Sequence, residues 1–203
     1  MSGRFVVFEG PEGAGKTTQI ARLAAALPDA VVTREPGGTK GGEAVRAALL
    51  SQETEWSPLA EALLMNAARD AHLREVIEPA LAQGRSVLCD RFSASTAAYQ
   101  GGGGGLDRGI VETLRGWVCP RAPDLTLVFD LDVKVGLDRA AARGRADRFE
   151  AKGAEYHERV RAAFRRIAGQ PGAALIDASG SQDDVAARVA AAVHEALPGL
   201  LRA

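Results

Sequence analysis

Short, nearly continuous apolar runs alternate along this chain with longer segments in which apolar residues recur every three or four positions. Apolar runs of this kind predict strands of a parallel sheet that is buried on both faces. We expect five such strands, at residues 4–9, 30–33, 86–90, 124–130 and 173–176. The helical periodicity predicts helices at residues 16–27, 42–51, 58–83, 94–99, 107–118, 133–143, 154–169 and 182–197. This alternation predicts a single α/β domain over residues 1–203, with a five-stranded parallel sheet flanked by helices.

Proline and glycine indicate where some of these elements begin, bend and end. Ser57 and Pro58 are residue types that favour the start of a helix, Pro79 predicts a kink near the end of that helix, and Gly84 predicts its termination. The consecutive glycines at residues 101–105 have too much backbone freedom to favour a helix, so we expect a mobile loop there.

Composition narrows the class of protein. The 203 residues are 46% hydrophobic and 25% charged, which excludes disordered, collagenous and disulfide-built chains. The formal net charge of -1 argues against a nucleic-acid partner held by a basic face, and no stretch approaches the roughly 18 apolar residues of a membrane span. Two isolated cysteines, Cys89 and Cys119, and an N-terminal apolar run too short for a signal peptide predict a cytoplasmic protein.

The first motif along the chain that indicates a function is GPEGAGKT at residues 10–17. It matches the pattern G-x-x-x-x-G-K-[ST] and lies between a predicted strand and a predicted helix, which is the context that a phosphate-binding loop requires. Glycines let backbone N–H groups face an anion, Lys16 reaches the β- and γ-phosphates, and Thr17 can hold Mg²⁺. The motif predicts a three-layer P-loop fold and nucleotide binding by Gly10, Pro11, Glu12, Gly13, Ala14, Gly15, Lys16, Thr17 and Thr18.

A phosphate-binding loop does not reveal how the nucleotide is used. A glycine-rich turn without a ligand, an ATPase and a small-molecule kinase all remain open, whereas the sequence lacks the Asn-Lys-x-Asp motif of a switch GTPase. Three further clusters narrow the choice, because they gather at strand ends, where open parallel sheets bind ligands. They are TREPGGT at residues 33–39, MNAAR at residues 65–69 and DRFSASTAAYQG at residues 90–101.

In these clusters, and in motif order over residues 4–180, the chain resembles the thymidylate kinase family. The resemblance implies a homodimeric enzyme that phosphorylates dTMP to dTDP, with ATP as phosphoryl donor and Mg²⁺. It implies that Arg34 and Arg91 bind the acceptor phosphate and that Tyr99 lies under the deoxyribose, where its bulk would exclude a 2′-hydroxyl. Glu12 would contact the nucleotide sugar or an acceptor arginine. The thymine base would be contacted by Arg69, Ser95, Thr96 and Gln100.

Two acidic residues near the phosphate-binding loop could contact magnesium, and one methionine departs from the pattern of the family. Asp90, at a predicted strand end, and Glu9 are expected to join Thr17 around magnesium, although Asp90 could instead orient Arg91. Met65 stands where the family usually has a phenylalanine that stacks on thymine. Because a thioether packs on a flat base with less geometric definition, base selectivity can differ, and core packing is the alternative role for Met65.

An arginine-rich stretch at about residues 141–153 resembles the lid of the family. Members carry a catalytic arginine either in the phosphate-binding loop or in the lid, and residues 11–14 contain no arginine here, so the lid must supply it. We expect Arg143 or Arg145, with Arg148 as a third candidate, to act with Lys16 and Arg91. Alternatively, the arginine-rich stretch is only a solvated helix end.

Two alternative functions remain open for the whole protein. One is a P-loop kinase that acts on another acceptor, and the other is a silent nucleotide-binding module.

Overall fold

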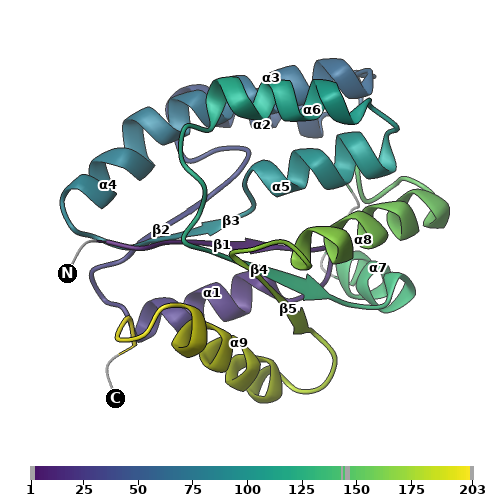
Figure 1. The fold of residues 1–203 in the computed structure, drawn as a ribbon. Coiled ribbons are helices and arrows are strands. Elements are labelled where there is room, and N and C mark those ends of the chain that lie inside the picture. The colour runs from purple at the N-terminus through teal and green to yellow at the C-terminus, as the bar shows by residue number, and fades with distance from the viewer. Residues whose placement is uncertain (1–2, 143, 145–146, 202–203) are drawn as a thin grey trace.

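The computed structural model describes residues 3–142, 144 and 147–201. Its centre is a sheet of parallel strands in the order β2-β3-β1-β4-β5 (Figure 1). The strands are β1 (Phe5–Glu9), β2 (Val31–Arg34), β3 (Val87–Asp90), β4 (Leu125–Asp130) and β5 (Ala173–Asp177). The predicted five-stranded parallel sheet is confirmed. Because β1 lies between β3 and β4, the strand order reverses beside β1, and such a reversal opens a ligand-binding crevice at the carboxyl ends of the strands.

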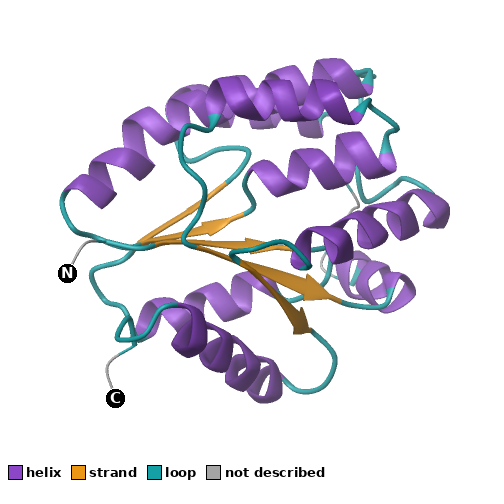
Figure 2. Ribbon diagram, in the orientation of Figure 1, coloured by secondary structure: helices purple, strands orange, loops and turns teal. Residues whose placement is uncertain are grey.

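Helices cover both faces of the sheet and complete the three predicted layers (Figure 2). The helices on one face are α1 (Lys16–Ala25) and α9 (Gln182–Ala196). Those over the other face or at the carboxyl end of the sheet are α2 (Lys40–Leu50), α3 (Pro58–His72), α4 (Glu78–Ala82), α5 (Ser93–Thr96), α6 (Arg108–Val118), α7 (Val133–Ala141) and α8 (Ala154–Ala168).

Adjacent residues of β4 pack into different parts of the core. Phe129 stacks on Phe8 in the cluster beneath α1 and α9, whereas Val128 packs with Val160 and Phe164 of α8. A strand that is covered on both faces needs apolar side chains at successive positions, which explains the nearly continuous apolar sequence of β4.

Within the described residues, no helix has the length and hydropathy needed to cross a membrane.

The glycine run differs from our prediction of a mobile loop. A π-helical segment, η2 (Ala97–Gly103), continues α5, so residues 101–103 are helical. This segment packs closely on α8. A Cβ added at Gly102 would lie 2.7 Å from Ala163 Cβ, and one added at Gly103 would lie 2.5 Å from the ring of Tyr156. Glycine is therefore required here by close packing between two helices, and the prediction from backbone freedom was wrong.

The helix expected over residues 58–83 is present but irregular. Ser57 caps it, accepting a hydrogen bond from the N–H of Ala60 at 3.2 Å. A wider π-helical turn, η1 (Leu73–Ile77), separates α3 from α4 and lies directly before Pro79. Proline has no N–H, and its ring would clash with a carbonyl of the preceding turn, so the wider turn accommodates Pro79 without ending the helix.

Candidate active site

The phosphate-binding loop joins β1 to α1. Gly10, Gly13 and Gly15 have φ angles of 136°, 69° and 81°, a region that favours glycine. Lys16 begins α1, and its Nζ donates hydrogen bonds to the carbonyl oxygens of Gly10 at 3.2 Å and Pro11 at 3.1 Å. Burial lowers the pKa of Lys16. The ammonium group is thus held across the loop, beside the N-terminus of a helix that favours anions.

Thr17 and Asp90 lie together at the edge of this loop. The Thr17 hydroxyl donates a hydrogen bond to Asp90 Oδ2 at 3.4 Å, while the buried Asp90 Oδ1 has no partner among the described residues. Hydroxyl and carboxylate oxygens are ligands that suit Mg²⁺, which usually keeps water and phosphate oxygens as its other ligands. The described residues contain no group of three or more acidic, histidine or cysteine side chains that could hold a metal by themselves. This pair therefore fits a magnesium ion shared with a nucleotide.

Glu9 is arranged differently from the magnesium role that we expected. It is fully buried, and its Oε1 accepts hydrogen bonds from the N–H groups of Phe92 at 2.8 Å and Ser95 at 3.0 Å. Its Oε2 accepts one from the Ser95 hydroxyl at 2.6 Å. Burial raises the pKa of Glu9 to about 7, against the lowering effect of Arg91. Both carboxylate oxygens thus hold the start of α5, which carries predicted base-contacting residues.

Arg91 is the centre of the acceptor side. It is the sole described residue other than glycine with a positive φ, 69°, which turns its side chain back toward the phosphate-binding loop. Its Nη2 donates to Glu12 Oε1 at 2.7 Å and its Nη1 to the Gly10 carbonyl at 3.0 Å. Tyr99 donates its hydroxyl to the same Glu12 oxygen at 2.8 Å, and the guanidinium carbon of Arg91 lies 4.9 Å from the Tyr99 ring centroid. Glu12, Arg91 and Tyr99 therefore form one rigid unit.

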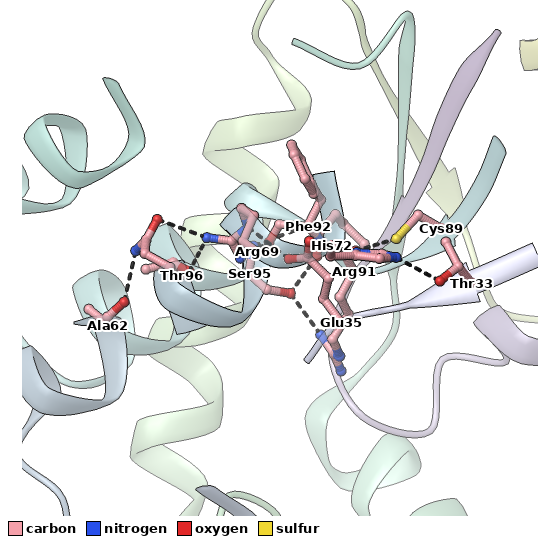
Figure 3. Close-up of polar contacts among 12 residues, drawn as sticks. Thr33, Glu35, Ala62, Arg69, His72, Cys89, Arg91, Phe92, Ser95 and Thr96 are labelled. Atoms are coloured by element: carbon pink, nitrogen blue, oxygen red, sulfur yellow. Dashed lines mark hydrogen bonds and ion pairs between the residues drawn. The ribbon is translucent and has the colours of Figure 1, made fainter. Parts of the chain in front are cut away.

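Arg69 lies in a buried polar network (Figure 3). Its Nε donates to Glu35 Oε2 at 2.7 Å, and the other Glu35 oxygen lies 3.1 Å from Nδ1 of His72. Its Nη1 contacts the Thr96 hydroxyl at 3.2 Å, and its Nη2 donates to the Phe92 carbonyl at 3.0 Å. Because each guanidinium nitrogen has a protein partner, Arg69 fixes α3 against the start of α5.

Two adjoining cavities contain most of the predicted binding residues. The first, of about 110 Å³, is lined by the expected acceptor residues Glu12, Met65, Arg69, Arg91, Ser95, Tyr99 and Gln100 and by Glu35, Pro36, Arg46, Leu50, Phe92, Asp147 and Phe149. The second, of about 250 Å³, is lined by Glu12, Gly13, Ala14, Gly15, Lys16, Thr17, Thr18, Arg34, Glu35, Arg46, Asp90, Arg91, Asp147 and Glu150. Glu12 and Arg91 line both cavities.

Two predicted substrate residues lie outside the first cavity. Arg34 lines the second cavity, where its Nη2 pairs with both carboxylate oxygens of Glu43, at 2.9 and 3.1 Å. Thr96 is buried behind Arg69 as its hydrogen-bond partner. A larger cavity, of about 690 Å³, lies between α6 and α8 and includes no residue of the phosphate-binding loop. The candidate site is therefore the pair of cavities joined at Arg91.

Arg148 is the lid candidate that falls within the described residues. Its Nη2 lies 2.8 Å from Glu61 Oε1, its Nε donates to the Leu49 carbonyl at 3.1 Å, and its guanidinium carbon lies 4.8 Å from the Phe149 ring centroid. These contacts hold Arg148 against α2 and α3, so we propose that it anchors the lid. The other two candidates, Arg143 and Arg145, lie outside the described residues.

Comparisons with known proteins agree with this geometry. The family model described as thymidylate kinase matches residues 8–189. The thymidylate kinase of Caulobacter vibrioides is 49% identical, with 96% of this chain and 98% of that protein covered. That of Pseudomonas entomophila is 51% identical over 99% of this chain and 98% of its own. The chain belongs to the thymidylate kinase family. The crystal structure of thymidylate kinase from Ehrlichia chaffeensis, 33% identical, superposes with a TM-score of 0.76 over 94% of this chain and 98% of that one.

Sequence reasoning missed several polar residues that shape the site of this thymidylate kinase family member. Glu35 lies inside the TREPGGT cluster, which drew attention only to Arg34, and His72 follows Arg69 at helical spacing. Glu61 precedes Met65 and Arg69 at steps of four residues, which places all of them on one helix face. That shared face was the available signal. Arg46, which lines both cavities, had no such signal.

Proposed function

We propose that this member of the thymidylate kinase family transfers the γ-phosphoryl group of ATP, bound with Mg²⁺, to dTMP. The observation that carries the proposal is the unit of Glu12, Arg91 and Tyr99 at the junction of the two cavities. A donor phosphate on the glycine-rich loop and an acceptor phosphate in the neighbouring cavity would meet at Arg91, which contacts the Gly10 carbonyl of that loop. This arrangement supports transfer between two bound substrates.

The proposed mechanism relies on positioning and charge. The acceptor oxygen belongs to a phosphomonoester whose second pKa is about 6, so it is already mostly anionic at neutral pH and needs no general base. Lys16 and Arg91 would neutralise charge on the transferred group, together with the lid arginine, Arg143 or Arg145. Magnesium, held beside Thr17 and Asp90, would supply further neutralisation of the donor phosphates. The protein thus contributes a fixed geometry for in-line transfer.

The base side of the proposed reaction involves Met65. Its side chain packs against the cluster of Tyr99 and Phe149 and also lines the first cavity, so its core-packing role and its place in the site coexist. A thioether at this position would lie against the thymine with less defined geometry than an aromatic ring. The acceptor preference of this chain is therefore a property to be measured.

An acceptor panel tests the proposal. Purified protein is incubated with Mg²⁺ and ATP and, in turn, with dTMP, dUMP, dCMP, dGMP and shikimate, while ADP release is followed. We expect ADP release that depends on dTMP and exceeds that with every other acceptor. A clear preference for another acceptor would instead support the alternative of a different P-loop kinase. The absence of any acceptor-dependent ADP would indicate a silent nucleotide-binding module.

We also propose a homodimer formed through α3 and α6. Large apolar side chains are exposed along these neighbouring helices: Leu59 at 42%, Leu63 at 50%, Ile110 at 39% and Trp117 at 77%. Neighbouring exposed apolar side chains indicate a protein interface. Sedimentation velocity should give a dimer that Trp117→Arg converts to a monomer, whereas a monomeric wild-type chain would contradict the proposal.

We further propose a cytoplasmic location. This proposal rests on Cys89 and Cys119 being free thiols.

A further inference from the structure

Glu61 is a buried carboxylate that joins the acceptor side to the lid. It lies in the first turns of α3 and is 1% exposed. Its Oε2 accepts a hydrogen bond from Nε2 of Gln100 in η2 at 2.9 Å. Its Oε1 lies 2.8 Å from Nη2 of Arg148 and 3.7 Å from Nζ of Lys152, both in the lid segment. One carboxylate therefore contacts three separate parts of the site.

Arg148 and Lys152 face Oε1 of the Glu61 carboxylate, and both side chains carry only N–H donors, so this oxygen serves as an acceptor. Both cations are themselves held in place. Lys152 Nζ lies 4.4 Å from the Tyr156 ring centroid and 5.2 Å from that of Phe149, and Arg148 also stacks on Phe149. An ionised carboxylate only accepts hydrogen bonds. Glu61 therefore offers its neighbours two acceptor oxygens and no donor.

This property determines which end of the Gln100 amide faces Glu61. A side-chain amide has a donating nitrogen and an accepting oxygen, and only the nitrogen can pair with an ionised carboxylate. The amide oxygen must then point away from Glu61. Gln100 is 1% exposed and lines the first cavity, and its Oε1 is buried with no hydrogen-bond partner among the described residues. A buried acceptor without a donor is costly, so it favours a ligand that brings one.

We propose that Glu61 is a positioning residue that fixes the Gln100 amide with its oxygen toward the acceptor base, so that the site selects a pyrimidine whose N3 carries a hydrogen. The proposal rests on the proposed function, because it assigns the first cavity to the acceptor nucleotide. Thymine and uracil carry this N3–H, whereas cytosine has an unprotonated, accepting N3. A site built around a specific hydrogen bond rejects a ligand that cannot form it, because its buried polar group is left unpaired.

The substitution Glu61→Gln tests the proposal with little change in shape. The new amide can present its own nitrogen to Gln100, which frees the Gln100 amide to turn over and offer its NH₂ group to cytosine N3. We expect the ratio of kcat/KM for dTMP to that for dCMP to fall about tenfold or more. The ratio for dTMP to dUMP should stay at its wild-type value, because both bases carry N3–H. Glu75→Gln, which removes an exposed carboxylate of η1, is the matched control and should leave both ratios unchanged.

Two outcomes of this experiment would overturn the proposal. One is a wild-type dTMP to dCMP ratio in Glu61→Gln. The other is an equal fall in the dTMP to dCMP and dTMP to dUMP ratios, which would indicate general distortion of the cavity. If Glu61→Gln does not fold, the exchange variant Glu61→Gln with Gln100→Glu decides the matter, since it keeps one carboxylate in the pair and again leaves only an accepting oxygen at position 100. We expect that variant to retain the wild-type preference within a few-fold, and a loss of tenfold or more would refute the proposal.

Calorimetric binding separates this proposal from the proposed function. If the wild-type protein shows no ADP release that depends on dTMP, the proposed kinase reaction fails. The positioning role of Glu61 is then read from dissociation constants alone, with dTMP and dUMP binding more tightly than dCMP to the wild type and this preference falling in Glu61→Gln. Equal binding of dTMP and dCMP by the wild-type protein would overturn the inference even if the enzyme turns dTMP over.

Discussion

Helix α7 meets the phosphate-binding loop at a pair of glycines, Gly13 and Gly136. A Cβ added at Gly136 would lie 2.5 Å from the carbonyl oxygen of Glu12, and one added at Gly13 would collide with the carbonyl oxygen of Gly136. Both contacts involve backbone, so no side chain can turn aside to make room. We predict that Gly136→Ala pushes the loop and α7 apart and distorts the anion-binding backbone around Glu12.

The size of the effect follows from two opposing contributions. Alanine in place of glycine in a helix interior contributes about 0.8–1 kcal/mol of stability. Overpacking of a close contact costs about 1–3 kcal/mol. Gly116 in α6 is exposed, and a Cβ added there would have nothing within 4 Å, so Gly116→Ala experiences the first contribution alone. The free energy of unfolding of Gly136→Ala should therefore lie about 1–3 kcal/mol below that of Gly116→Ala.

Urea unfolding and steady-state kinetics together measure this prediction. Unfolding curves with equal slopes give the free-energy difference between the two alanine variants from their midpoints. Because the Glu12 carbonyl must move in Gly136→Ala, we expect the KM for ATP to rise several-fold in that variant, with the wild-type value in Gly116→Ala. Equal stability of the two variants together with an unchanged KM for ATP would refute the reasoning that this glycine contact holds the loop in shape.

Three further predictions concern charged side chains. Burial raises the pKa of Glu9 from 4.5 to about 7, so its protonated form stabilises the fold below pH 4.5, and this contribution is lost as the pH rises to 7. Glu9→Gln should accordingly gain on the order of 3 kcal/mol relative to wild type between about pH 4 and pH 8 in urea unfolding, and a constant difference would contradict this. Arg69→Ala leaves a buried carboxylate uncompensated and should cost about 3–5 kcal/mol in the same assay, against about 0.5 kcal/mol or less for the exposed Arg74→Ala. Alanine at Arg143 or Arg145 should lower kcat by ~10³-fold or more for the true lid arginine, and values within a few-fold of wild type for both would refute the assignment of the catalytic arginine to these two positions.

The sheet could be predicted from local pattern, whereas the close contacts between elements could not. Strands β1 and β4 are apolar along most of their length because they are covered on both faces, so their runs were visible without knowledge of their neighbours. The glycines at 101–103 gave a false signal. Backbone freedom is a property of the residue itself, but the role of Gly102 and Gly103 depends on how closely α8 approaches, which is set by a segment far along the chain.

The same distinction applies to the candidate site. The phosphate-binding loop is a continuous segment whose glycines need positive φ angles, so its sequence alone identified it. Glu61 was missed because its role arises only where Gln100 and the lid meet it in three dimensions. The resemblance to the family implied that Arg148 belongs to a lid, but could not reveal its contacts with Glu61 and with the Leu49 carbonyl.

Carboxylates divide the arginines of this site into two classes. Arg34 pairs with Glu43 at the surface, with side-chain exposures of 53% and 45%, and such a pair contributes so little that Arg34 can exchange it for a phosphate at small cost. Arg69 pairs with Glu35 at 2% and 3% exposure, and separating a buried pair leaves an uncompensated charge. We therefore propose that Arg69 shapes the cavity, while Arg34 remains available to an incoming anion. The net charge of -1 is thus compatible with phosphate binding. Each of these two arginines is paired with a carboxylate, and only the exposed pair can be separated at small cost.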